Sequence, residues 1–84
     1  MSAARDRPDL QRWLIEALEG LDGKGAIPEI CQFVWDRHEA DLRSSGMLFY
    51  TWQYDIRWAA TKLRHSGVLR PAQASPRGTW EIIH

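Results

Sequence analysis

The residues of this chain that could bind a metal ion or act in acid–base or nucleophilic catalysis are three histidines and one cysteine. His38, His65 and His84 share no metal-ligand spacing with one another or with Cys31. The acidic residues that follow His38 lack the second histidine of a zinc-protease helix. We therefore expect no metal, no cofactor and no catalytic residue, which means that the chain is not expected to be an enzyme.

Basic residues are concentrated in the C-terminal half of the chain. The 84 residues carry 11 basic and 11 acidic side chains, so the formal net charge is zero. Residues 47–84 nevertheless hold five basic side chains against only Asp55 and Glu81. A basic half in a neutral chain is typical of proteins that bind nucleic acid.

The segment from Thr51 to Ser66 has a basic polar face when it is placed on a helical wheel. At about 100° per residue, one side is apolar and contains Trp52, Ile56, Ala59, Ala60 and Leu63. The opposite side has no carboxylate and contains Gln53, Tyr54, Arg57, Thr61, Arg64 and His65. We expect Asp55 and Lys62 on one flank of the helix. An ordinary solvated face mixes both charge signs, so this pattern favours contact with DNA.

Each polar side chain of this face has a known mode of DNA contact. Glutamine pairs with adenine edges, arginine pairs with guanine edges, and threonine touches a thymine methyl group or a phosphate. Arg70 and Arg77 lie in a predicted hairpin that follows the helix and could contact phosphates or the minor groove. The expected partner is double-stranded DNA, and the candidate contacts are Thr51, Gln53, Tyr54, Arg57, Thr61, Arg64, Arg70 and Arg77. Four or five phosphate contacts would give a log–log salt slope of about −4.

The spacing of apolar residues and of helix-ending residues predicts the elements that carry these side chains. Residues 1–8 are predicted to form a flexible arm and residues 9–84 a single domain. We expect Thr51 to cap its helix and Gly46 to end the preceding one in a left-handed conformation. The predicted order is helix 9–20, strand 25–27, helix 28–45, apolar linker 47–50, helix 51–66, and a hairpin of strands 68–72 and 79–83. This order is α+β and is typical of a winged helix-turn-helix domain.

Five tryptophans give this short chain the apolar surface for a stable core. We expect Cys31 to be a small core residue. Trp58 lies at the edge of the polar face, so the linker or the hairpin covers it, or it is an exposed anchor for a partner. The single cysteine, a polar N-terminus and the lack of a membrane-spanning run predict a cytoplasmic protein without a membrane partner.

Two motifs are similar to those of a known protein family. Residues 56–69, IRWAATKLRHSGVL, resemble a signature of the N-terminal domain of Mrr-type restriction proteins, and residues 75–82, SPRGTWEI, resemble its Arg-Gly-x-Trp strand. The start of the second predicted helix, Ala26 to Ile30, agrees more weakly. The resemblance implies a winged helix and DNA binding, in a regulatory or restriction-related module. In this family a nuclease domain usually follows, whereas these 84 residues contain none, so neither cleavage nor a preference for methylated bases is expected.

Two further interpretations remain open. A lone domain of this size should bind DNA weakly, so a homodimer or a larger protein partner is expected to add specificity. Alternatively, the winged helix is an adaptor or dimerisation module that does not bind DNA, which the zero net charge, Trp58 and the apolar linker favour. A truncated regulatory piece of a restriction protein, inert alone, is the third possibility.

Overall fold

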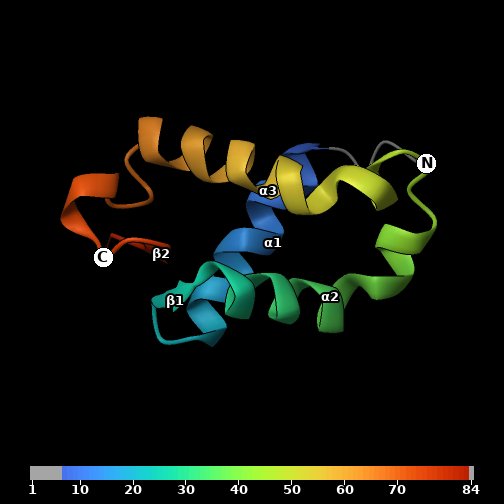
Figure 1. The fold of residues 1–84 in the computed structure, drawn as a ribbon, viewed down its shortest axis with the longest axis horizontal. Helices are drawn as coiled ribbons and strands as arrows, with labels where there is room; N and C mark the ends of the chain where they lie inside the picture. Colours follow the sequence, from blue (N-terminus) through green and yellow to red (C-terminus); the bar gives the residue numbers. More distant parts are fainter. Residues whose placement is uncertain (1–6, 84) are drawn as a thin grey trace.

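The computed structural model describes residues 7–83 and forms a small α+β domain with three helices and a two-stranded antiparallel sheet. In Figure 1, α3 lies along the top of the view and α2 along the bottom. Helix α1 lies between them, and the strands are at one end of the molecule. The elements in chain order are α1 (Arg7–Gly20), β1 (Lys24–Ala26), α2 (Ile27–Arg43), α3 (Leu48–His65), a 3₁₀ turn η2 (Ala72–Ala74) and β2 (Thr79–Glu81).

Helix α1 buries one apolar side in the core. Leu10, Leu14 and Leu18 have no exposed surface, as expected for residues spaced four apart on one side of a helix. The helix begins at Arg7, so the last two residues of the predicted arm are helical. The rest of that arm, residues 1–6, lies outside the described residues. None of the helices between residues 7 and 83 has both the length and the apolar character that a bilayer-spanning segment requires.

Helix α2 begins at Ile27, which shifts the preceding strand by one residue from the predicted 25–27 to Lys24–Ala26. Pro28 occupies the first turn, where its missing N–H is not needed. The Glu29 carboxylate accepts a hydrogen bond from the Ala26 backbone N–H at 3.1 Å and satisfies a donor at the start of the helix. Gly46 is left-handed as predicted, with φ of 65°, but it lies three residues beyond the helix end at Arg43.

His38 interrupts the helical geometry of α2 and connects it to α1. Its backbone has φ of −128° and ψ of 22°, which marks a kink. Its ring stacks on Trp13 of α1 with 4.2 Å between centroids. Its Nε2 lies 2.6 Å from Glu16 Oε1, and its Nδ1 lies 3.7 Å from Asp41 Oδ2. The kink is therefore held against α1 by the ring stack and the polar contact of His38.

We expect His38→Ala to lower the free energy of unfolding by about 1–2 kcal/mol, because the substitution removes the ring stack and the hydrogen bond to Glu16. The matched control is His65→Ala, since His65 is exposed on α3 and should change stability by less than about 0.5 kcal/mol. Urea unfolding of both variants measures the difference. Equal stabilities of the two variants would contradict the role assigned to His38.

Helix α3 begins at Leu48, so the predicted linker is its first turn and the prediction that Thr51 caps the helix is wrong. Leu48 packs against the core, and Phe49 lies 6.3 Å from Trp35 between ring centroids. These tertiary contacts stabilise helical geometry in a segment without a capping side chain. Thr51 instead lies inside the helix, where its hydroxyl donates a hydrogen bond to Asp55 Oδ2 at 2.7 Å.

The predicted hairpin is only partly formed. Strand β2 pairs with β1 in antiparallel register, with Gly25 opposite Trp80. The segment expected as strand 68–72 contributes an isolated bridge, Leu69 to Ile82, and hydrogen bonds from Arg70 N to Glu81 O and from Ile83 N to Val68 O. Pro71 has no N–H to extend the ladder, and the chain turns into η2 directly after it. Residues 79–83 are thus bonded on one edge to β1 and on the other to residues 68–70.

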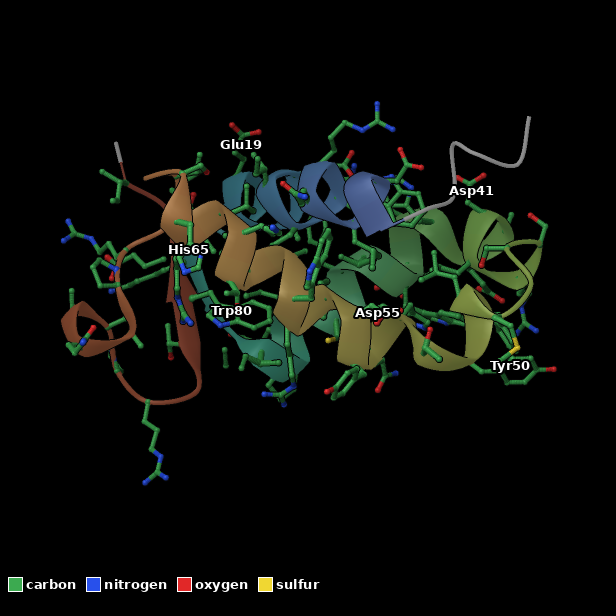
Figure 2. The ribbon with its side chains drawn as sticks, turned by 90° about the horizontal axis from the view of Figure 1, so that it is seen from above. Glu19, Asp41, Tyr50, Asp55, His65 and Trp80 are labelled. Carbon is green, nitrogen blue, oxygen red and sulfur yellow. The ribbon has the colours of Figure 1, made fainter. Side chains whose placement is uncertain are left out.

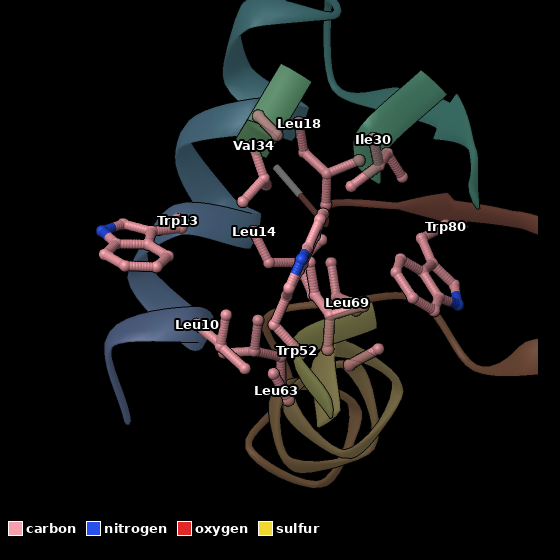
Figure 3. Packing of buried hydrophobic residues seen from close by; sticks show 14 of the residues in the cluster. Leu10, Trp13, Leu14, Leu18, Ile30, Val34, Trp52, Leu63, Leu69 and Trp80 are labelled. Atoms are coloured by element: carbon pink, nitrogen blue, oxygen red, sulfur yellow. The ribbon is translucent and has the colours of Figure 1, made fainter. Parts of the chain in front are cut away.

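The core lies between the three helices and the sheet (Figure 3). Helices α1 and α3 make the most extensive contact, and the small side chains of Ala59 and Ala60 on α3 are buried in the core. The predicted buried face of α3 is confirmed, because Trp52, Ile56 and Leu63 are at most 4% exposed. Trp80 closes the core at the sheet. Trp58 is half-buried against the core, and the Lys62 ammonium lies 5.7 Å from its ring centroid.

Candidate nucleic-acid interface

The outward face of α3 carries four of the predicted contact residues together. Gln53, Tyr54, Arg57 and Thr61 are all exposed. They follow one another at helical spacing, so their side chains leave the helix within about 100° of arc. The Thr61 hydroxyl donates a hydrogen bond to the Arg57 backbone oxygen at 3.1 Å, which leaves its methyl group and lone pairs accessible. The buried residues on the other side fix this orientation against α1.

A shallow groove beside this face is formed with α2, which the sequence interpretation did not anticipate. One part, of about 420 Å³, is lined by Ile27, Pro28, Cys31, Gln53, Tyr54 and Arg57. An adjoining part, of about 410 Å³, is lined by Pro28, Cys31, Gln32, Trp35, Trp52 and Gln53. The exposed Gln32 amide therefore lies on the same side as Gln53. A helical wheel of a single helix could not have found it, because the groove depends on how two helices pack.

Cys31 lies at the floor of this groove and is half-buried rather than a fully buried core residue. Burial raises the pKa of its thiol above the ordinary value of 9.0, and the positive charge of Arg57 lowers the pKa by a smaller amount. The thiol is therefore protonated near neutral pH, and it senses the charge of Arg57 across the groove.

We expect iodoacetamide to alkylate Cys31 more slowly at pH 8 than it alkylates an unburied thiol, because a raised pKa leaves less thiolate. The rate should continue to rise above pH 9. Arg57→Ala removes the charge that lowers the pKa, so it should slow alkylation further at a given pH, whereas Arg37→Ala on α2 should not. Mass spectrometry of timed samples measures these rates. Faster alkylation of Cys31 in the Arg57→Ala chain would contradict this electrostatic assignment.

Arginines on different elements differ in whether carboxylates neutralise them. Arg12, Arg37 and Arg43, on α1 and α2, each form an ion pair with a carboxylate of those helices. Within residues 7–83, neither Arg57 nor Arg77 forms an ion pair. The basic side chains without a carboxylate partner among the described residues therefore include Arg57 on α3 and Arg77 in the turn before β2.

Most acidic side chains belong to the N-terminal elements of the chain. Apart from Asp55 and Glu81, every carboxylate of residues 9–83 belongs to the segment that ends with α2. Figure 2 shows Glu19 on the α1 side and Tyr50 on the opposite side, at the start of α3. The carboxylates are thus concentrated on α1, α2 and the segment between them, whereas the exposed charged side chains of α3 are basic.

Three predicted contact residues are placed less favourably than the sequence suggested. Arg64 is half-buried, and its Nε is buried without a hydrogen-bond partner among the described residues. Arg70 forms an ion pair with Glu81, with 3.6 Å between Nε and Oε2. Thr51 is half-buried and donates its hydroxyl to Asp55. Arg77 is exposed beside Gly78, whose φ of 76° permits the tight turn.

Asp55, which was predicted on one flank of the helix, is buried. It is 5% exposed and accepts the Thr51 hydroxyl. Its burial removes the one acidic side chain of α3 from the surface, so the exposed charges of this helix are all basic. A helical wheel could not predict the burial of Asp55, because the burial of a side chain on the flank of a helix depends on the neighbouring elements.

The described part of the chain contains no group of three or more histidine, cysteine, aspartate or glutamate side chains that could hold a metal ion. The candidate site consists of the exposed face of α3, the groove that α3 forms with α2, and the turn at Arg77. Comparisons with protein-family models, with curated proteins and with solved structures found no match to this chain.

Proposed function

We propose that this chain is a winged helix-turn-helix domain that binds double-stranded DNA without catalysing a reaction on it. The order helix, strand, helix, helix, strand supports this fold, and so does the arrangement in which residues 79–83 bond to β1 and to residues 68–70. In such a domain α3 is the recognition helix, α2 crosses behind it, and the turn of residues 71–78 is the wing.

The observation that carries the proposal is the state of Arg57. This guanidinium is exposed in the middle of α3, forms no ion pair within residues 7–83, and lies beside exposed Gln53 and Thr61. An exposed arginine without a carboxylate partner retains its full capacity for bidentate hydrogen bonds to guanine or phosphate. Arg12, Arg37 and Arg43 of α1 and α2 already have carboxylate partners and would have to exchange them for a phosphate or a guanine.

Each group of the site would have a separate task. Gln53 would contact base edges in the major groove and Arg57 a backbone phosphate or, where one is present, a guanine edge, while Thr61 and Tyr54 would fix the register on the backbone. Arg77 at the tip of the wing would contact phosphate or the minor groove. Arg70 would have to leave Glu81 before it could bind phosphate, so it should contribute less.

A fluorescence-anisotropy titration with a labelled random duplex at two salt concentrations tests the proposal. Arg57 and Arg77 are available, Arg64 is half-buried and Arg70 is paired, so we expect a log–log salt slope of about −2 to −3, shallower than the −4 that the sequence suggested. Binding that does not change with salt, or no binding up to high micromolar concentration, would favour the alternative function of a protein-interaction module. Exposed Met47 and Tyr50 give that alternative its structural support.

A further inference from the structure

The two glutamines that line the groove between α2 and α3 differ in what their amides contact. The Gln32 amide nitrogen donates a hydrogen bond to Asp36 Oδ1 at 2.8 Å, which holds this amide along α2. Asp36 also places a negative charge next to Gln32, which disfavours a phosphate there. Gln53 is exposed on α3, and its amide has no hydrogen-bond partner among residues 7–83. Its N–H donors and its carbonyl oxygen are therefore both available to a ligand.

The part of the groove next to Arg57 places the Gln53 amide beside an apolar surface. Gln53 and Arg57 belong to the α3 side of this part, and Ile27, Pro28 and Cys31 form its α2 side. We call the last three residues the apolar wall. Pro28 is exposed, and Ile27 and Cys31 are half-buried. A hydrogen-bonding amide thus adjoins an apolar wall, and none of the described residues that line this part is acidic.

We propose that this part of the groove recognises an A·T base pair through its major-groove edge, with Gln53 on adenine and the apolar wall on the thymine methyl group. The inference rests on the proposed function, because it assigns a base preference to the same DNA contact. A glutamine amide donates to adenine N7 and accepts from the N6 amino group, so adenine satisfies both ends of the amide. The C5 methyl group of thymine is the apolar group of the major groove, and contact with the wall removes it from water.

A G·C base pair is less complementary to this site. Guanine presents two acceptors, N7 and O6, so the Gln53 carbonyl oxygen would face another acceptor. Cytosine has no methyl group, and its N4 amino group would lose water against the apolar wall. Arg57 follows Gln53 by four residues, about 6 Å along the helix axis, so it can bind a phosphate while Gln53 contacts the base.

Anisotropy titrations of the 84-residue chain with three duplexes of equal length, at one salt concentration, test this preference. The first duplex contains A·T pairs in mixed order, and the second has deoxyuridine in place of every thymidine, which removes the methyl groups. The third has inosine–cytosine pairs, which keep the minor-groove edge of A·T but present the major-groove edge of G·C. We expect the deoxyuridine duplex to bind about fourfold more weakly than the A·T duplex, and the inosine–cytosine duplex about twentyfold more weakly.

Two alanine variants distinguish the free amide from the bonded one. Gln53→Ala should reduce the twentyfold difference between the A·T and inosine–cytosine duplexes to about the fourfold that the methyl group accounts for. The matched control is Gln32→Ala, which removes the other exposed glutamine of the groove and should leave the twentyfold difference unchanged. Both variants place alanine at an exposed helical position, so both should fold.

Several outcomes would overturn the proposal. Equal affinity for the A·T and inosine–cytosine duplexes would do so, as would a preference that Gln53→Ala leaves intact or that Gln32→Ala reduces equally. Equal affinity for the thymidine and deoxyuridine duplexes would also overturn it, because the apolar wall would then contact no methyl group. Salt-sensitive binding that is equal for all three duplexes would leave the proposed function standing without this preference. No binding to any duplex would contradict both.

Discussion

Replacing both Arg57 and Arg77 with alanine is expected to weaken binding to duplex DNA by roughly 10- to 100-fold, because each arginine contributes a charge-assisted hydrogen bond. The log–log salt slope should become less negative by about 2, since each phosphate contact contributes about −0.9. Both side chains are exposed and form no ion pair within residues 7–83. The melting temperature should therefore change little.

The matched control is Arg12→Ala/Arg37→Ala, which removes the same charge from α1 and α2. These two arginines are already paired with Asp9 and Glu16, so their loss should leave the salt slope nearly unchanged. Anisotropy titrations of both double variants at the same two salt concentrations provide the comparison. Equal DNA affinity of the wild type and Arg57→Ala/Arg77→Ala would refute the assignment of the site, and an equal loss in both double variants would show that only total charge matters.

Leu63→Ala is expected to lower the free energy of unfolding by about 2–5 kcal/mol, the range for a leucine that leaves a cavity in a packed core. Leu63 is 4% exposed in the core cluster. Its backbone oxygen also accepts hydrogen bonds from Val68 N and Leu69 N, so a shift of α3 at this point would disturb the segment that pairs with residues 82 and 83. For a domain of this size such a loss approaches the whole stability.

Thr61→Ala is the control for Leu63→Ala, because it changes an exposed position two residues away on the same helix. It should change the free energy of unfolding by less than about 0.5 kcal/mol. Thermal and urea unfolding followed by far-UV circular dichroism measure both variants. A Leu63→Ala chain as stable as the wild type would contradict the packing between α3 and the sheet.

The helices could be predicted from the sequence because their signals are local. The buried stripe of α1, the start of α2 near Pro28 and the apolar face of α3 each follow from spacing within one segment. The first turn of α3 could not be predicted, because Leu48 and Phe49 are held in helical geometry by Trp35 and the core. The hairpin predicted from the sequence is longer than the one in the structure. The strand propensity of residues 68–72 does not reveal that the pairing ends at Pro71.

The candidate site was predictable to the extent that it lies on one helix. The helical wheel correctly predicted that four side chains are exposed, namely Gln53, Tyr54, Arg57 and Thr61. Their exposure depends only on which side of the helix faces the core. It could not show the ion pair between Arg70 and Glu81, the partial burial of Arg64, or the contribution of Gln32 to the groove. These features depend on packing between elements that are distant in the sequence.

The central claim is that the outward face of α3 and the turn at Arg77 contact DNA. A titration of the ¹⁵N-labelled chain with a short duplex, followed by amide chemical shifts, tests it residue by residue. We predict the largest shifts at Gln53, Arg57, Thr61 and Arg77, with little change along α1. Shifts concentrated on α1, or none at a saturating duplex concentration, would contradict the claim.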